Sequence, residues 1–335
     1  MKVYYNSSLW DKSKGIYGRP QKINWEFEDG GLRRIIPNIY HFSKGIVFDL
    51  ITIIDEKEFS KFYNKYIDIE EELSPLEQRL VEQEHPYDEL SLKDIWINGE
   101  KVKEGYSGSG AFYSELNGEQ NELSKIKKAY SSILEDVNCF NCYRYMIPYP
   151  EADSKIDKLL RFFHLYKIKE IKFDTYPKTK FYPLEGEFEM SLEENLKEII
   201  FTHPTTGIEH RLYFQNPELL QIEDLYLIQA KYEIEPELLK WNNLQFDSSI
   251  HYGGMSTVDM DSNSAASIGI IGGADGPTSI IIAGREDKEI NYGQKGLPLH
   301  NALSIPSLKN QDIYKFILEG INIRIGESEE YRWKL

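Results

Sequence analysis

The sequence has few cysteines, fewer basic than acidic residues, and no apolar run at its start. Its two cysteines, Cys139 and Cys142, cannot build a disulfide framework, which is typical of a reducing compartment. The 39 lysines and arginines against 55 aspartates and glutamates give a net charge of −16 at pH 7, which repels phosphate backbones and anionic lipid head groups. The opening residues also lack the apolar run of a signal peptide. We therefore expect a soluble, cytoplasmic protein that binds neither nucleic acid nor a membrane.

Large aromatic residues compensate for a modest apolar fraction. The chain holds 16 Phe, 23 Tyr and 5 Trp within an apolar fraction of 41%, enough for a sizeable core. At 335 residues it exceeds the usual size of one domain, so two domains are predicted. The stretch Pro148-Tyr149-Pro150 favours a boundary there, between an α/β N-terminal domain of residues 1–150 and a β-rich C-terminal domain of residues 151–335.

Local patterns in the first half alternate between strand and helix. Residues 45–54 are rich in β-branched side chains and run into Asp55, which predicts a strand followed by a capped helix. Asn98-Gly99 between two apolar runs predicts a tight hairpin. Apolar residues at helical spacing predict two further helices, at residues 122–137 and 153–166.

The second half changes to a shorter period. Residues 167–235 favour an antiparallel sheet in which residues 203–210 form a turn between two strands. Residues 310–318 are predicted to be a helix, and residues 321–325 a final strand. Together these patterns predict an α+β fold, with antiparallel sheets and packed helices.

Residues 264–284 differ in composition from the rest of the chain. Two isoleucine-rich arms flank the cluster Gly-Gly-Ala-Asp-Gly-Pro, and Asp275 is the single ionisable residue of the segment. Glycine and proline at its centre cannot continue a helix and allow a sharp turn. The segment is therefore predicted to be an apolar β-hairpin with a six-residue turn.

Part of this hairpin has a family likeness. The run from Ala266 to Thr278, ASIGIIGGADGPT, resembles the signature of the β subunit of sodium-ion-translocating decarboxylases of the oxaloacetate decarboxylase type. In that family the matching segment is a re-entrant membrane element, and the resemblance implies that Asp275 helps to move sodium ions and protons. The resemblance is confined to this segment, since the remaining chain lacks the transmembrane helices of the family.

The same turn could also bind a ligand in a soluble protein. Glycine-rich turns aim backbone N–H groups at an anion, and Asp275 could instead hold a cation together with carbonyl oxygens. The residues predicted to bind a ligand here are Gly272, Gly273, Asp275, Gly276 and Thr278. A nucleotide-binding phosphate loop would need a lysine before Thr278, and proline stands there instead. Apart from the sodium ion that the resemblance implies, no cofactor is predicted.

Two pairs of residues are candidates for metal or thiol chemistry. His203 and His210 stand at the two ends of the predicted turn and could face each other, but a metal would need a third ligand. Cys139 and Cys142 have the spacing of a redox pair. They follow a predicted helix instead of starting one, so no helix dipole lowers a thiol pKa. Structural histidines and buried thiols are the alternative interpretation.

These observations leave three hypotheses for function. The leading one is a non-catalytic binding or interaction module, in which a partner or a second copy adds to the hairpin at 264–284. The second is a sodium-ion-handling or decarboxylase-related protein that uses Asp275. The third is a metal- or thiol-dependent enzyme that uses the histidines or the cysteines. The linear motifs of serine hydrolases, zinc proteases and kinases are missing from the sequence.

Overall fold

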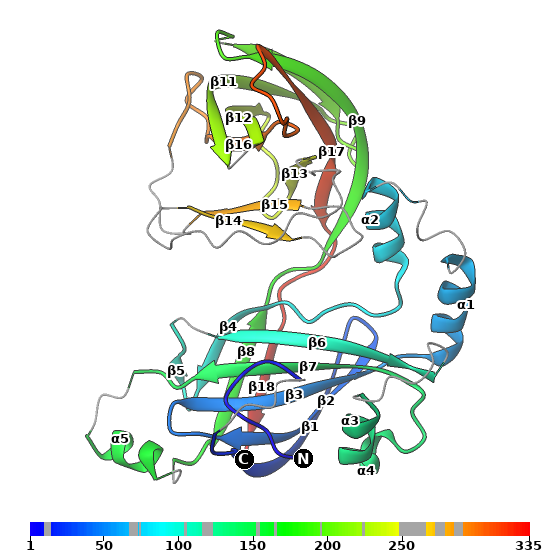
Figure 1. Ribbon diagram of the computed structural model, residues 1–335, viewed down its shortest axis with the longest axis vertical. Coiled ribbons are helices and arrows are strands. Elements are labelled where there is room, and N and C mark those ends of the chain that lie inside the picture. Colours follow the sequence, from blue (N-terminus) through cyan, green and yellow to red (C-terminus); the bar gives the residue numbers. More distant parts are fainter. Residues whose placement is uncertain are drawn as a thin grey trace. The chain divides into compact units, whose positions relative to one another are not determined.

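The computed structural model describes most of the chain (Figure 1). The described residues are 1–9, 15–66, 73, 75–103, 106–115, 123–151, 155–163, 166–194, 196–222, 225–247, 266–271, 279–284 and 291–335. Antiparallel sheets dominate, with a few helices, so the predicted α+β class is confirmed. No helix in these ranges is long and apolar enough to cross a membrane.

The chain forms two compact units, and the backbone passes between them more than once. Unit 1 comprises residues 1–72, 84–177 and 327–335, and unit 2 comprises residues 73–83 and 178–326. The stretch at Pro148-Tyr149-Pro150 lies within unit 1, because strands on both sides of it belong to the sheets of that unit.

Unit 1 is built from two antiparallel sheets that share one core. The order of the first sheet is β1 (Arg19–Asp29), β2 (Leu32–His41), β3 (Gly45–Ile53), β7 (Cys139–Pro148) and β6 (Ser107–Ser114). The order of the second is β18 (Glu330–Lys334), β8 (Glu170–Thr175), β4 (Leu92–Ile97) and β5 (Glu100–Lys101). Side chains from both sheets, such as Phe48 and Phe173, meet in this core. Burial of such rings is the main term that stabilises the unit.

The helices of unit 1 start and stop as local signals dictate, with one exception. These helices are α1 (Glu56–Tyr66), α3 (Leu123–Ala129), α4 (Ser131–Leu134) and α5 (Lys155–Phe162). Asp55 Oδ1 accepts hydrogen bonds from the backbone N–H groups of Lys57 and Glu58, which confirms the predicted cap of α1. The single helix predicted at residues 122–137 is instead two short helices, because the backbone leaves the helical region at Tyr130.

The hairpin predicted at Asn98-Gly99 is also confirmed. Both residues have positive φ, 53° and 85°, and strands β4 and β5 pair on either side of them. The side chain of Asn98 then ties this turn to the start of β8, since its Oδ1 accepts from the N–H groups of Lys169 and Glu170. A type I′ turn favours this dipeptide because both residues tolerate positive φ.

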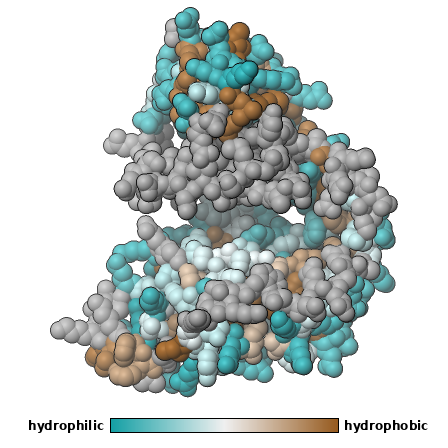
Figure 2. Space-filling view, in the orientation of Figure 1, coloured by the Kyte–Doolittle hydropathy of each residue, from teal (hydrophilic) through white to brown (hydrophobic). Residues whose placement is uncertain are grey.

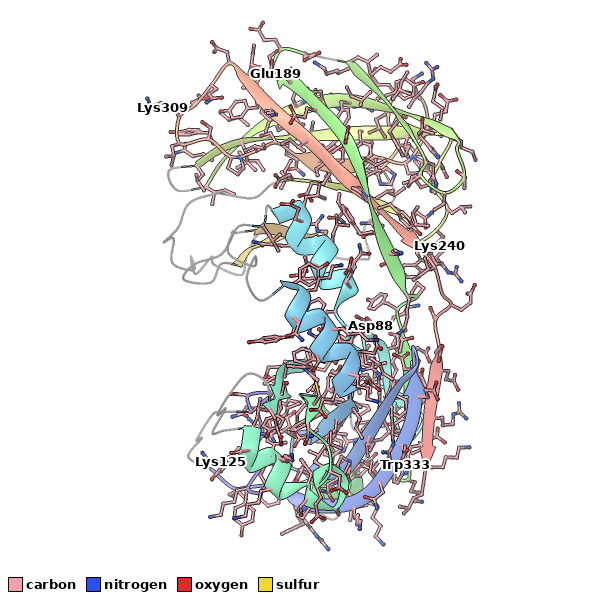
Figure 3. The ribbon with its side chains drawn as sticks, turned by 90° about the vertical axis from the view of Figure 1, so that its right-hand side faces the viewer. Asp88, Lys125, Glu189, Lys240, Lys309 and Trp333 are labelled. Carbon is pink, nitrogen blue, oxygen red and sulfur yellow. The ribbon has the colours of Figure 1, made fainter. Side chains whose placement is uncertain are left out.

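Unit 2 contains a second sandwich and helix α2 (Pro75–Glu84). One sheet has the order β10 (Lys197–Thr202), β11 (Glu209–Ile222), β12 (Leu225–Glu235) and β16 (His300–Leu303). The other has the order β13 (Asn243–Phe246), β17 (Ile313–Arg324) and β9 (Thr179–Ser191). Figure 3 shows β9 and β17 running side by side, with Glu189 near one end of the pair. The core between the sheets includes Phe188, Phe214 and Phe316.

One predicted element of unit 2 is wrong. Residues 310–318 do not form a helix, because most of them belong to strand β17, which pairs with β9 and β13. Tyr314, Phe316 and Leu318 alternate with more exposed residues and face the core. This period of two is the strand signal, and it outweighs the helical spacing that the surrounding residues also fit.

The segment at 264–284 contains two short strands. Strand β14 (Ala266–Ile271) pairs antiparallel with β15 (Ser279–Gly284), in the register Ala266 to Gly284 through Ile271 to Ser279. Among the described strands, each of the two pairs only with the other. The connecting turn lies outside the described residues.

Candidate functional site

A pocket of about 600 Å³ opens in unit 2, where β9, β13 and β17 meet helix α2. Its walls combine apolar side chains with carboxylates, and no lysine or arginine is among the lining residues. The lining consists of Leu76, Leu184, Glu185, Gly186, Glu187, Asp247, Ile317 and Glu319. Pockets of this size with a few polar groups among apolar walls are typical of small-molecule sites.

The alternation of β17 places Glu319 on the same face as Ile317, and both residues line this pocket. The register of β17 shifts between Leu318 and Gly320 against β9, and the pairing with β13 shifts at the same place. Gly320 is required beside the bulge, since a Cβ there would lie 2.3 Å from the ring of Phe181.

Asp247 reaches the pocket from the end of β13. Its backbone N–H donates to the carbonyl oxygen of Ile317 at 2.9 Å, which continues the pairing of β13 with β17 by one residue. Asp247 and Glu319 are both buried, at 9% and 6% exposure. Both carboxyl groups thus belong to the lining of one pocket.

Helix α2 supplies a cation to one of these carboxyl groups, Glu319. Arg79 Nη1 donates to Glu319 Oε2 at 2.5 Å, and its guanidinium lies over the ring of Phe181 at 4.9 Å from the centroid. Gln83 fixes the helix against β9, because its amide exchanges two hydrogen bonds with the backbone of Phe181. Arg79 is therefore held in place by packing as well as by charge.

Burial and the neighbouring charges act in opposite directions on Glu319. Burial raises the pKa of Glu319 above its ordinary value, and the charge of Asp247 raises it further, whereas Arg79 lowers it. A buried carboxylate with a second one beside it resists carrying a full charge. In the part of the chain that the structure describes, no group of three metal-binding side chains is present.

The structure brings the two predicted histidines together. The ring centroids of His203 and His210 are 5.8 Å apart, across the pair formed by β10 and β11. His203 Nδ1 accepts from the N–H groups of Thr205 and Thr206, and His210 Nδ1 lies 2.7 Å from the carbonyl oxygen of Pro236. Burial lowers the pKa of His203, and the neighbouring His210 lowers it further. These contacts are typical of structural histidines that stabilise a turn. Nδ1 of each histidine already takes part in a hydrogen bond.

The two cysteines are not brought together. Cys139 and Cys142 are three residues apart on β7, whose pairing with β3 and β6 is regular, so their side chains lie on opposite faces. Cys139 packs beside Ile54 and Phe59, whereas Cys142 packs in a cluster with Leu134. Burial raises the pKa of Cys139 to about 12 and raises that of Cys142 as well. Both thiols are thus kept protonated and unreactive at neutral pH.

The glycine-rich turn falls outside the described residues. This applies to all five predicted ligand-binding residues, Gly272, Gly273, Asp275, Gly276 and Thr278. Their role therefore stays a prediction from the sequence.

The residues of the unit 2 pocket were missed by the sequence analysis. Arg79 and Glu319 are 240 residues apart, and no linear motif connects them with Asp247. One signal was available. Glu319 is a lone acidic residue in the run Phe316-Ile-Leu-Glu-Gly-Ile-Asn-Ile323, and a carboxylate inside such an apolar strand is rarely buried without a reason.

Comparisons with known proteins add little to this geometry. The sequence matches no protein-family model and no curated protein. Among solved structures, it is similar to a conserved domain protein from Bacillus anthracis, with 9% identity over 96% of each chain and a TM-score of 0.19. A likeness of this size carries no argument about fold or function.

Proposed function

We propose that this chain is a cytoplasmic, non-catalytic binding module whose unit 2 pocket takes a small ligand with a cationic head and an apolar tail. The observation that carries the proposal is the buried carboxyl pair, Asp247 and Glu319, in a pocket whose lining has four carboxylates and no basic residue. An ammonium or guanidinium group would pair with these oxygens. Leu76, Leu184 and Ile317 would cover an alkyl chain of a few carbons.

The ion pair between Arg79 and Glu319 is part of the proposed site. It holds one Glu319 oxygen in place, so that an incoming cation meets a fixed carboxyl group. Preorganisation of this kind reduces the entropy that a ligand must lose on binding. Lys315 pairs in the same way with Glu187 at 2.8 Å, on the outer part of the lining.

Calorimetric titration with hexylamine and with its neutral counterpart 1-hexanol tests this function. We expect the amine to bind more tightly than the alcohol. Glu319→Gln or Asp247→Asn should weaken the binding of the amine by about tenfold and leave the affinity for the alcohol unchanged. Glu218→Gln is the matched control, because Glu218 is an exposed carboxylate of unit 2 that pairs with Lys231. Equal affinities for amine and alcohol, or for variants and wild type, would show that the pocket does not select cations.

The hairpin β14–β15 supports a second candidate function, association through strand addition. The two strands pair only with each other among the described strands, and an isolated two-stranded hairpin is marginally stable in water. A strand from a partner or from a second copy would complete it. The double substitution Ile270→Lys and Ile281→Lys should then reduce the sedimentation mass of any oligomer while the circular dichroism stays unchanged. Loss of the folded signal would place the hairpin in a core instead.

The resemblance to the sodium-translocating decarboxylases supports one further test. If Asp275 binds sodium, the melting temperature should be higher in sodium chloride than in choline chloride, because a ligand that binds only the folded state stabilises it. Asp275→Asn should abolish that difference. A melting temperature that is the same in both salts would remove this role.

A further inference from the structure

Helix α2 forms one wall of the unit 2 pocket, and Figure 1 draws it beside β9. Leu76, Arg79 and Gln83 are three and four residues apart, so they share one side of the helix. Leu76 lines the pocket, and Arg79 pairs with Glu319. Gln83 bonds to the backbone of Phe181. These three side chains form the docking face of α2.

The docking face buries little apolar surface. None of the described side chains of residues 76–84 is buried. By contrast, Tyr314 and Phe316 of β17 are almost fully buried. Because burial of apolar side chains is the main source of stability, segments with few such contacts open at a smaller cost in free energy than the core does. We therefore expect α2 to detach more easily than the strands on which it lies.

Local signals stabilise the first turn of α2 better than the last. Pro75 at the first helical position and Glu77 in the first turn suit an N-terminus. Glu82 and Glu84 lie in the last turn, which contains no basic residue, and their charge opposes the helix dipole. Lys65 pairs with Glu84, but at an exposed site where an ion pair stabilises little. A helix of ten residues is also marginal in isolation, so α2 depends on its docking contacts.

Helix α5 of unit 1 shows what a firmer attachment looks like. Its apolar side chains turn to the solvent, and Figure 2 shows them as a hydrophobic patch at the lower left. They are Ile156, Leu159, Phe162 and the next residue, Phe163. Arg161 holds the opposite side, because it is buried and its guanidinium stacks on the rings of Tyr149 and Tyr166, at 4.9 and 4.7 Å from their centroids. Arg79 of α2 stacks on one ring, and its side chain is 37% exposed.

Gln83 attaches α2 to the outer edge of β9. Its Oε1 accepts from the N–H of Phe181 at 2.7 Å, and its Nε2 donates to the carbonyl oxygen of Phe181 at 3.2 Å. A side-chain amide carries the same kinds of donor and acceptor as a backbone amide, so Gln83 replaces a neighbouring strand at this position. Gln83 is exposed, and water can therefore take over both hydrogen bonds when the helix leaves. The attachment is thus reversible.

We propose that α2 is a strap that opens and closes over the unit 2 pocket, with Gln83 and Arg79 as its latch. In the closed form Leu76 completes the apolar wall and Arg79 holds Glu319. In the open form the pocket loses this wall while the sheets of unit 2 stay folded. The part that concerns a ligand rests on the proposed function, since an amine that contacts Leu76 and Glu319 favours the closed form. Gln83 does not line the pocket and is a positioning residue for it.

Hydrogen exchange of the full chain, followed by mass spectrometry, tests the strap without ligand. We expect peptides of α2 to exchange at least about tenfold faster than peptides of β12. Gln83→Ala and Glu319→Gln should each speed the exchange of α2 several-fold further and leave β12 unchanged. Alanine favours a helix more than glutamine does, so the effect of Gln83→Ala cannot come from a loss of helix propensity. Glu82→Ala is the matched control, because Glu82 is the exposed neighbour of Gln83.

A second arm of the experiment adds hexylamine. At a free concentration about ten times the dissociation constant from calorimetry, the exchange of α2 should slow by about tenfold, because the amine favours the closed form. Exchange of α2 that is as slow as that of β12, or that Gln83→Ala leaves unchanged, would overturn the strap. So would hexylamine that binds in calorimetry without slowing α2. If no hexylamine binds while Gln83→Ala still opens α2, the proposed function fails and the strap stands.

Discussion

Buried charges in unit 1 are held by partners on neighbouring strands. Asp49 on β3 faces Arg144 on β7, and the buried guanidinium of Arg144 donates hydrogen bonds of 2.7 and 2.9 Å to the buried carboxylate of Asp49. Tyr130 donates to the same carboxylate at 2.6 Å. The carbonyl oxygen of Ser8 accepts from Arg144, so the N-terminal segment also depends on this pair. A bidentate pair with further partners offsets the desolvation that burial of two charges costs.

Removal of one partner from this pair should destabilise the protein strongly. Asp49→Ala leaves the Arg144 guanidinium buried without its counter-charge, and we expect a loss of about 3–5 kcal/mol in the free energy of unfolding, measured by urea titration. Glu26→Ala is the control, because Glu26 pairs with Arg33 at an exposed site. A loss of less than about 1 kcal/mol for Asp49→Ala would mean that water reaches Arg144.

Ligand binding at Glu319 should depend on pH. Because burial raises the pKa of Glu319, this carboxyl group takes up a proton at a higher pH than the ordinary 4.5. Protonation removes the negative charge that an amine requires, so the affinity for hexylamine should be full at pH 8 and should decrease as the pH falls towards 5. Titrations across this range measure the effect, with Glu319→Gln as the reference. A profile as steep in that variant as in the wild type would assign the pH dependence to another group.

At the level of helices and strands, prediction succeeded where one or two residues dictate the geometry. Asp55 caps α1 and Asn98-Gly99 forms its turn because the requirement in each case is local. Prediction failed at residues 310–318, where the pairing of β17 with two other strands decides the structure. It also gave the position of α5 without its orientation, since the stacking of Arg161 on two tyrosines involves residues outside the helix.

The cap of α1 allows a test of whether a single residue determines the start of a helix. Asp55→Ala removes the acceptor for the N–H groups of Lys57 and Glu58. We expect the first turn of α1 to open more often, so that these two amides exchange hydrogen several-fold faster, while the amides of β3 are unaffected. Asp55→Ser keeps a capping oxygen and should restore slow exchange. Fast exchange in both variants would mean that side-chain charge, and not the cap, protects the turn.

For the molecule as a whole, the location of the pocket was beyond sequence reasoning. Its carboxyl groups come from β13 and β17, and the cation comes from α2, which precedes both by a large part of the chain. The chain enters unit 2 at residues 73–83 and leaves it before returning at residue 178. Only this discontinuous path brings Arg79 to Glu319. A boundary drawn at one point of the sequence cannot represent such an arrangement.

The division into two units predicts separate responses to core substitutions. Phe48 and Phe316 are both almost fully buried, the first in the core of unit 1 and the second in that of unit 2. Phe316→Ala should cost about 3–5 kcal/mol and Phe48→Ala a similar amount. Because the cores are distinct, hydrogen exchange followed by mass spectrometry should show lost protection in peptides of residues 178–326 for Phe316→Ala, and in peptides of residues 84–177 for Phe48→Ala. Equal loss in both sets of peptides would mean that the repeated crossing of the chain makes the two units unfold together.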